Sequence, residues 1–168
     1  MTAWIGIIGT VIGALVGGGL ALLNAHLQTR RQVEQDRRKL ILSKLEELHE
    51  AISHFRHESR ETLLLVMAMP ADSNAEGMQQ SKERRNLSLE RIEMLAGFYA
   101  PELSEQLLNT LQKTVSYMDA VVTYGMTKRS GEAHDKNTFD ELLSKREKFD
   151  DALTLMQMEL VKVSKKYM

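Results

Sequence analysis

Residues 41–55 read ILSKLEELHEAISHF, and this stretch decides the fold. Its apolar residues recur in alternating steps of four and three, the spacing that places side chains on one side of an α-helix. They are Ile41, Leu45, Leu48, Ile52 and Phe55. After polar Ser59 and Thr62 the pattern resumes at Val66 and Met69, and Pro70 cannot continue a helix. The sequence therefore predicts an amphipathic helix that ends at Pro70.

Three further amphipathic helices are predicted downstream. The signals for their starts are a Ser73–Glu76 capping box, Pro101 as a first helical residue, and a Thr138–Glu141 capping box. The second helix is expected to end at Ala100 and the third at Gly125 or in the Ser130–Gly131 loop. Four amphipathic helices with short connections fold most simply as an antiparallel bundle, which we predict for residues 41–168.

The apolar stripe of each helix predicts the core of this bundle. The second helix contributes Met78, Leu89, Ile92, Ala96 and Tyr99. The third contributes Leu103, Leu107, Leu111, Val115, Met118 and Val122, and the fourth Leu142, Phe149, Leu153, Met156, Leu160, Val163 and Tyr167.

Composition agrees with an all-α chain and removes several function classes. The 168 residues include 2 prolines, no cysteine and 5% aromatic residues, so disulfides, thiolate metal sites and cysteine nucleophiles are excluded. The sequence has no glycine-rich phosphate loop, no HExxH and no G-x-S-x-G motif. With a formal net charge of -1 it also lacks the basic character of a protein that binds nucleic acid duplexes. We expect a non-enzymatic protein without a cofactor.

The N-terminal residues predict a single membrane span. Trp4 to Leu23 is an uncharged run, and twenty helical residues at ~1.5 Å each match a hydrocarbon core of ~30 Å. No basic residue precedes the run, whereas Arg30, Arg31, Arg37 and Arg38 follow it closely. By the positive-inside rule the N-terminus is expected outside a bacterial-type inner membrane, with the C-terminal domain in the cytoplasm.

Small residues recur every four positions within this predicted transmembrane segment, residues 1–24. Gly9, Gly13, Gly17 and Ala21 fall on one helix face, which is the pattern that lets membrane helices approach closely. The segment is therefore expected to self-associate as a glycine zipper and make the protein a homo-oligomer. Glycine is also common in membrane helices generally, which is the competing explanation.

Residues 25–40 are too polar to be buried and are predicted to form a basic juxtamembrane stalk. The side chains of Arg30, Arg31, Arg37 and Arg38 can contact anionic lipid headgroups there, at about 1 kcal/mol each.

Four polar residues stand where the bundle seams expect apolar ones. They are Ser59, Thr62, Arg85 and Arg146, and they fall at similar heights along their helices. Two guanidiniums facing a bundle interior need anionic partners, supplied either by internal carboxylates or by a ligand such as a phosphate. In the ligand interpretation Lys82, Arg84 and Arg91 reinforce a positive patch.

A second polar group, Glu50, His54, His57 and Glu61, has spacing that could suit a metal ion. This face lies about 160° from the apolar seam, so we interpret it as solvated and predict no metal site.

The order of these parts resembles that of small membrane-anchored effectors in bacterial antiviral nucleotide signalling, including ancillary effectors of type III CRISPR systems. The resemblance extends to domain order alone. It implies a cytosolic bundle that senses an anionic signal, such as a cyclic nucleotide, and a membrane helix that perturbs or permeabilises the membrane. The alternative is a membrane-anchored scaffold or accessory subunit whose bundle docks a cytosolic protein.

Overall fold

A computed structural model describes the backbone of residues 2–68, 76–130 and 136–168. It describes side chains for residues 17–68, 77–130 and 136–168. These residues form helices α1 (Thr2–Ala68), α2 (Glu76–Tyr99), α3 (Ser104–Arg129) and α4 (Lys136–Ser164), with a 3-10 helix, η1, at Pro101–Leu103. No strand occurs in these ranges, so the all-α prediction is confirmed.

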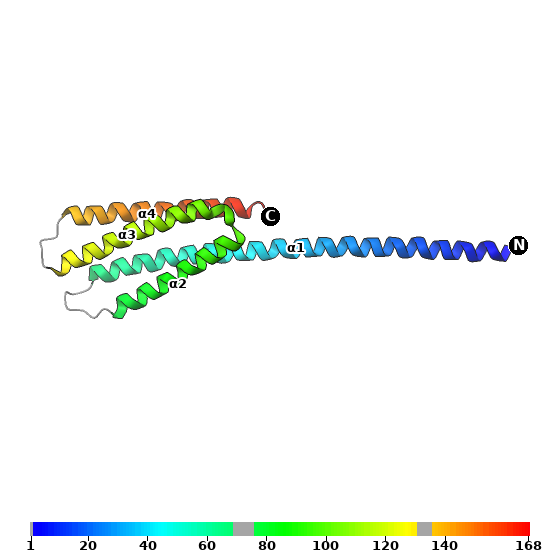
Figure 1. The fold of residues 1–168 in the computed structure, drawn as a ribbon, viewed down its shortest axis with the longest axis horizontal. Helices are drawn as coiled ribbons and strands as arrows, with labels where there is room; N and C mark the ends of the chain where they lie inside the picture. Colours follow the sequence, from blue (N-terminus) through cyan, green and yellow to red (C-terminus); the bar gives the residue numbers. More distant parts are fainter. Residues whose placement is uncertain (1, 69–75, 131–135) are drawn as a thin grey trace. The chain divides into compact units, whose positions relative to one another are not determined.

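The chain divides into two compact units, Met1–Leu40 and Ile41–Met168. The boundary falls at the first residue of the heptad pattern. In the second unit, consecutive helices run in opposite directions and pack side by side as a four-helix bundle (Figure 1).

An aromatic cluster lies at the centre of the bundle. The rings of Tyr117 and Phe149 stack with centroids 5.0 Å apart, and Phe55 meets Phe149 edge-on at 5.9 Å. These three side chains, from α3, α4 and α1, are almost completely buried. Offset and edge-to-face ring pairs add stabilisation beyond that of the buried area.

The predicted seams of α1 and α4 are confirmed. From α1 the core takes Leu45, Leu48, Ile52, Phe55 and Val66, and from α4 it takes Leu142, Phe149, Leu153, Met156, Leu160 and Val163. Met69 and Ser73 lie outside the described residues, and so does Gly131.

The predicted core face of α3 is right only in part: Leu103 is buried and Leu107 and Met118 pack against the core, but the helix is rotated relative to the rest of the predicted stripe. Val115 and Val122 are 61% and 47% exposed, whereas the buried residues are Thr110, Thr114, Tyr117, Val121 and Tyr124. The two threonines can be buried because each hydroxyl donates to a carbonyl four residues earlier, at 2.8 Å. Alternating steps of four and three connect the buried positions from Leu103 to Tyr124, so this face follows the bundle axis.

Two helix boundaries also differ from the prediction. α4 begins at Lys136, so Thr138 lies inside the helix and is not its N-cap. Pro101 begins η1 rather than α3, which then ends at Arg129 with Ser130 as C-cap. Helix ends are the least specified part of a sequence pattern because one or two residues can join or leave a terminal turn.

In the first unit, every side chain described between residues 17 and 40 is exposed. A Cβ atom added at Gly17 would meet no heavy atom within 4 Å. Among the described residues, no helix has an apolar stretch that is long enough to cross a membrane. The side chains of residues 1–16, which include Gly9 and Gly13 and most of the predicted span, lie outside the described set, so the span stays a prediction.

Candidate functional site

The polar residues of α1 are buried and linked to α2 by hydroxyl groups. Thr62 donates to the carbonyl of Glu58 at 2.9 Å, and its Oγ1 lies 2.7 Å from the hydroxyl of Ser81. Because Thr62 has already used its single proton, Ser81 is the donor in that pair. The hydroxyl oxygen of Ser59 is completely buried and has no hydrogen-bond partner among the described residues.

Arg85 of α2 reaches into this layer. Its Nη1 donates to Thr62 Oγ1 at 3.3 Å, and no carboxylate of the described residues forms an ion pair with it. Burial lowers the pKa of Arg85 below its usual value, and Tyr117 and Glu58 offset only part of that effect. Arg85 is therefore a half-buried cation whose charge lacks a close counter-ion.

Asp150 of α4 forms ion pairs with three arginines, two from α1 and one from α4. Arg60 Nη2 contacts its two carboxylate oxygens at 3.1 and 3.2 Å. The Nε atoms of Arg56 and Arg146 lie 3.7 and 3.8 Å from the same carboxylate. Arg56 Nε is buried and has no hydrogen-bond partner among the described residues. One negative charge thus serves three positive ones.

Tyr117 of α3 lies close both to the group around Ser59 and Arg85 and to the arginines around Asp150. Its hydroxyl donates to the carbonyl of Ser59 at 3.4 Å. Burial raises the pKa of Tyr117 to about 12, and the negative charge of Asp150 acts in the same direction but less strongly than burial. The positive charges of Arg146, Arg85 and Arg60 lower this pKa and offset part of the increase. Arginines from α1, α2 and α4 are thus all close enough to act on one buried phenol.

We call this group of side chains the arginine layer. It consists of Arg56, Arg60, Arg85, Arg146, Ser59, Thr62, Ser81, Tyr117, Glu58 and Asp150. Four guanidiniums face two carboxylates, so the layer holds excess positive charge at partly buried positions of the bundle.

The structure brings together four of the seven residues that the sequence indicates for anion binding: Ser59, Thr62, Arg85 and Arg146. The other three lie on the exposed surface of α2. Arg84 pairs with Glu61 at 3.6 Å, and Arg91 pairs with Glu47 at 3.4 Å. Lys82 is exposed and forms no ion pair within the described ranges.

Six residues of the arginine layer were not predicted from the sequence: Arg56, Glu58, Arg60, Ser81, Tyr117 and Asp150. Tyr117 could have been found, because it continues the four-three spacing of the buried face of α3. Arg60 and Asp150 interrupt no seam, so only the packing of α1 against α4 reveals them.

The histidine-containing face of α1 is solvated, as predicted. Glu50, His54 and His57 are exposed, and His57 Nε2 lies 3.3 Å from Glu61. In the described parts of the chain, no group of three or more acidic or histidine side chains could hold a metal ion.

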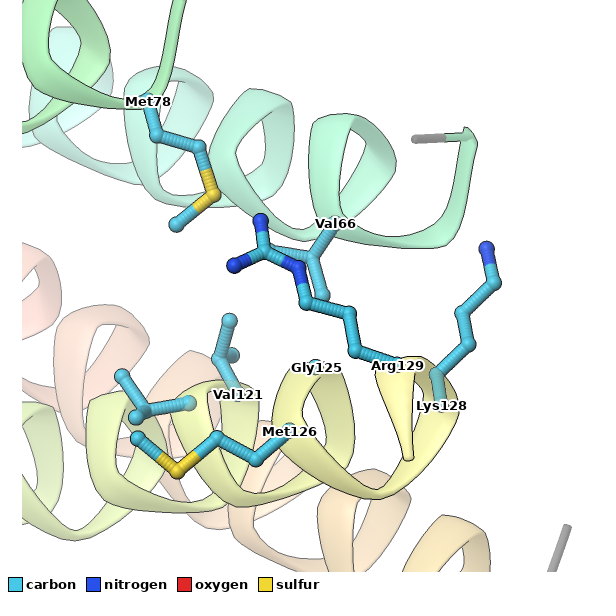
Figure 2. A pocket seen from close by; sticks show the side chains of 8 residues that line it. Val66, Met78, Val121, Gly125, Met126, Lys128 and Arg129 are labelled. Carbon is cyan, nitrogen blue, oxygen red and sulfur yellow. The ribbon is translucent and has the colours of Figure 1, made fainter. Parts of the chain in front are cut away.

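A small apolar cavity of about 110 Å³ opens between α1, α2 and α3 (Figure 2). Val66, Met78, Val121 and Met126 line it together with Lys128 and Arg129, and the guanidinium of Arg129 extends toward Met78. Lys128 Nζ donates to the carbonyl of Met67, which fixes it to the end of α1. The lining is mostly apolar, and none of the residues of the arginine layer belongs to it.

Comparison of the chain with protein-family models, with curated protein sequences and with solved structures gave no match.

Proposed function

We propose that the helical bundle is a sensor for a phosphate-type anion, held at a membrane by the N-terminal helix, and that it acts as a non-enzymatic effector. The anion is expected to be a nucleotide or a cyclic oligonucleotide. The self-associating N-terminal helix would then perturb or permeabilise the inner membrane. A role in antiviral defence rests only on the resemblance in domain order.

The observation that carries the proposal is that Arg85 has no ion pair with any carboxylate of the described residues. Within that part of the chain its half-buried guanidinium donates to a neutral hydroxyl at 3.3 Å and retains most of its donors for another acceptor. Guanidinium and phosphate form short, charge-assisted hydrogen bonds in paired geometry. An anion bound at Arg85 would also neutralise part of the excess charge of the arginine layer.

The layer also suggests how binding could change the bundle. Arg60 and Arg146 share Asp150, so an incoming anion competes with that carboxylate for the same guanidiniums. Arg60 belongs to α1, Arg85 to α2 and Arg146 to α4. A ligand that these arginines share would therefore alter the packing of three helices at once. One of them, α1, is the helix that also contains the residues of the first unit.

The membrane part of the proposal is supported by the sequence. The uncharged run of Trp4 to Leu23 has the length of a bilayer core, and the basic residues follow it on one side only. The open surface around Gly17 leaves room for a second helix there.

The test is thermal unfolding of the full-length protein with inorganic pyrophosphate, nucleotides and cyclic oligonucleotides, compared with chloride at equal ionic strength. A ligand at 100 times its Kd should stabilise the protein by about 2.7 kcal/mol. Arg85→Met should abolish that stabilisation, and Arg84→Met, an exposed neighbour, should retain it. If no anion stabilises the wild type, or if Arg85→Met responds equally, the sensor proposal is wrong and the scaffold alternative gains support.

A further inference from the structure

Helix α3 carries a second apolar face that the bundle leaves uncovered. Leu108, Val115, Val122 and Met126 are 58%, 61%, 47% and 67% exposed. Leu111 and Met118 lie between them and are partly buried, Met118 against the bundle core, so the stripe is largely but not wholly exposed. At 100° per residue these six side chains form one continuous stripe, about 130° around the helix from the buried face. We call this stripe the outer seam.

The outer seam has the residue pattern of a two-stranded coiled coil. Its positions are 108, 111, 115, 118 and 122, in alternating steps of three and four. Val115 and Val122 then occupy a positions, while Leu111 and Met118 occupy d positions. β-branched residues at a with unbranched or γ-branched residues at d favour parallel pairs of helices. A helix with two such faces is built to pack on two sides.

Charge also favours a second copy of this chain as the partner. In a parallel, in-register pair each seam residue faces its own copy, so any charge on the seam would meet a like charge. From Leu108 to Met126 the six seam positions carry none. Lys113 lies on another face of the helix, and Asp119 lies at the edge of the seam, where it flanks the pairing surface without entering it. Arg129 lies one heptad after Val122, so the pairing is expected to end before it.

We propose that α3 pairs with α3 of a second copy through the outer seam, in parallel and in register. The parallel orientation rests on the proposed anchoring, because two chains held in one membrane present their bundles in the same direction. The paired seam is short, at about 27 Å for residues 108–126. Anchoring therefore contributes to its stability by raising the effective concentration of the second bundle.

Disulfide cross-linking tests this pairing directly, because the natural chain has no cysteine. Single substitutions Leu108→Cys, Val115→Cys and Val122→Cys should each give covalent dimers when the full-length protein is oxidised in its membrane. In-register seam positions bring Cα atoms within the ~7 Å that a disulfide permits. All three side chains are about half exposed or more, so the substitutions leave the bundle core intact.

Asn109→Cys and Thr123→Cys are the matched controls, because both residues are exposed on other faces of α3. The proposal predicts at least several-fold more dimer at the three seam positions than at either control. Dimer at position 115 alone would indicate antiparallel pairing and overturn the parallel arrangement. Equal cross-linking at seam and control positions, or none at the seam, would overturn the interface itself. None of these outcomes involves the arginine layer, so they leave the anion proposal to its own test.

Discussion

Replacing Asp150 with asparagine leaves the side-chain volume almost unchanged and removes the one carboxylate of the described residues that forms ion pairs with Arg56, Arg60 and Arg146. In that part of the chain the three guanidiniums then have no counter-ion. The carboxylate is about 25% exposed, and the three arginine side chains are 24%, 48% and 38% exposed. The pair network is thus intermediate between a buried one and a surface one.

This intermediate exposure sets the expected magnitude. Breaking a buried pair costs about 3 to 5 kcal/mol, and an exposed pair is worth about 0 to 1 kcal/mol. We therefore expect Asp150→Asn to lower the free energy of unfolding by about 1 to 3 kcal/mol. For a unit the size of Ile41–Met168 this corresponds to a decrease in Tm of about 4 to 11 °C.

Circular dichroism during thermal and urea unfolding measures this change. Asp151→Asn is the control, because Asp151 is exposed and has no ion pair among the described residues, so its Tm should stay near that of the wild type. Arg146→Met should also have a small effect, because Asp150 keeps Arg56 and Arg60 as partners. If Asp150→Asn unfolds within about 0.5 kcal/mol of the wild type, Asp150 does not hold the layer together and the charge argument fails.

Three further predictions follow from the same structure and sequence. The pKa of Tyr117 is raised from 10.0 to about 12 in the folded state, so as the pH rises the unfolded chain loses this proton first. The contribution of Tyr117 to the free energy of unfolding should therefore be complete below pH 10 and decrease by about 2 to 3 kcal/mol towards pH 12. Tyr117→Phe should lose that part of the pH dependence, and an unchanged alkaline unfolding curve in this variant would contradict the assignment. Gly13→Leu with Gly17→Leu should reduce the mass of the detergent-solubilised oligomer in light scattering, whereas an unchanged mass would show that the glycine zipper is not the interface. A reporter fused after Met168 should be active only in the cytoplasm, and periplasmic activity would refute the predicted orientation.

The sequence predicts α1 and α4 well because their buried faces are almost wholly apolar. Within residues 41–68 of α1, Leu45, Leu48 and Ile52 lie on one face and are buried, as their spacing predicts. In α3 the outer seam is more apolar than the true core face, which contains Thr110 and Thr114. Hydropathy alone therefore selects the wrong face, and the hydrogen bonds that make buried threonines acceptable appear only in the folded helix.

The candidate site is predictable to the extent that its residues interrupt a seam. Ser59, Thr62, Arg85 and Arg146 stand at apolar positions of their helices and can be identified from spacing. Asp150 can not, because a carboxylate beside a seam is ordinary on an amphipathic helix. Its role depends on the rotation of α4 against α1, which is a property of packing rather than of either helix alone.

The affinity of pyrophosphate for the full-length protein, measured by titration calorimetry, tests the central claim most directly. Wild type and Arg84→Met should bind with the same Kd. Arg85→Met should bind at least about tenfold more weakly, because a hydrogen bond to a charged group contributes about 1.5 to 3 kcal/mol. Equal affinity for Arg85→Met and wild type, or no binding by the wild type, would contradict the assignment of the arginine layer as an anion site.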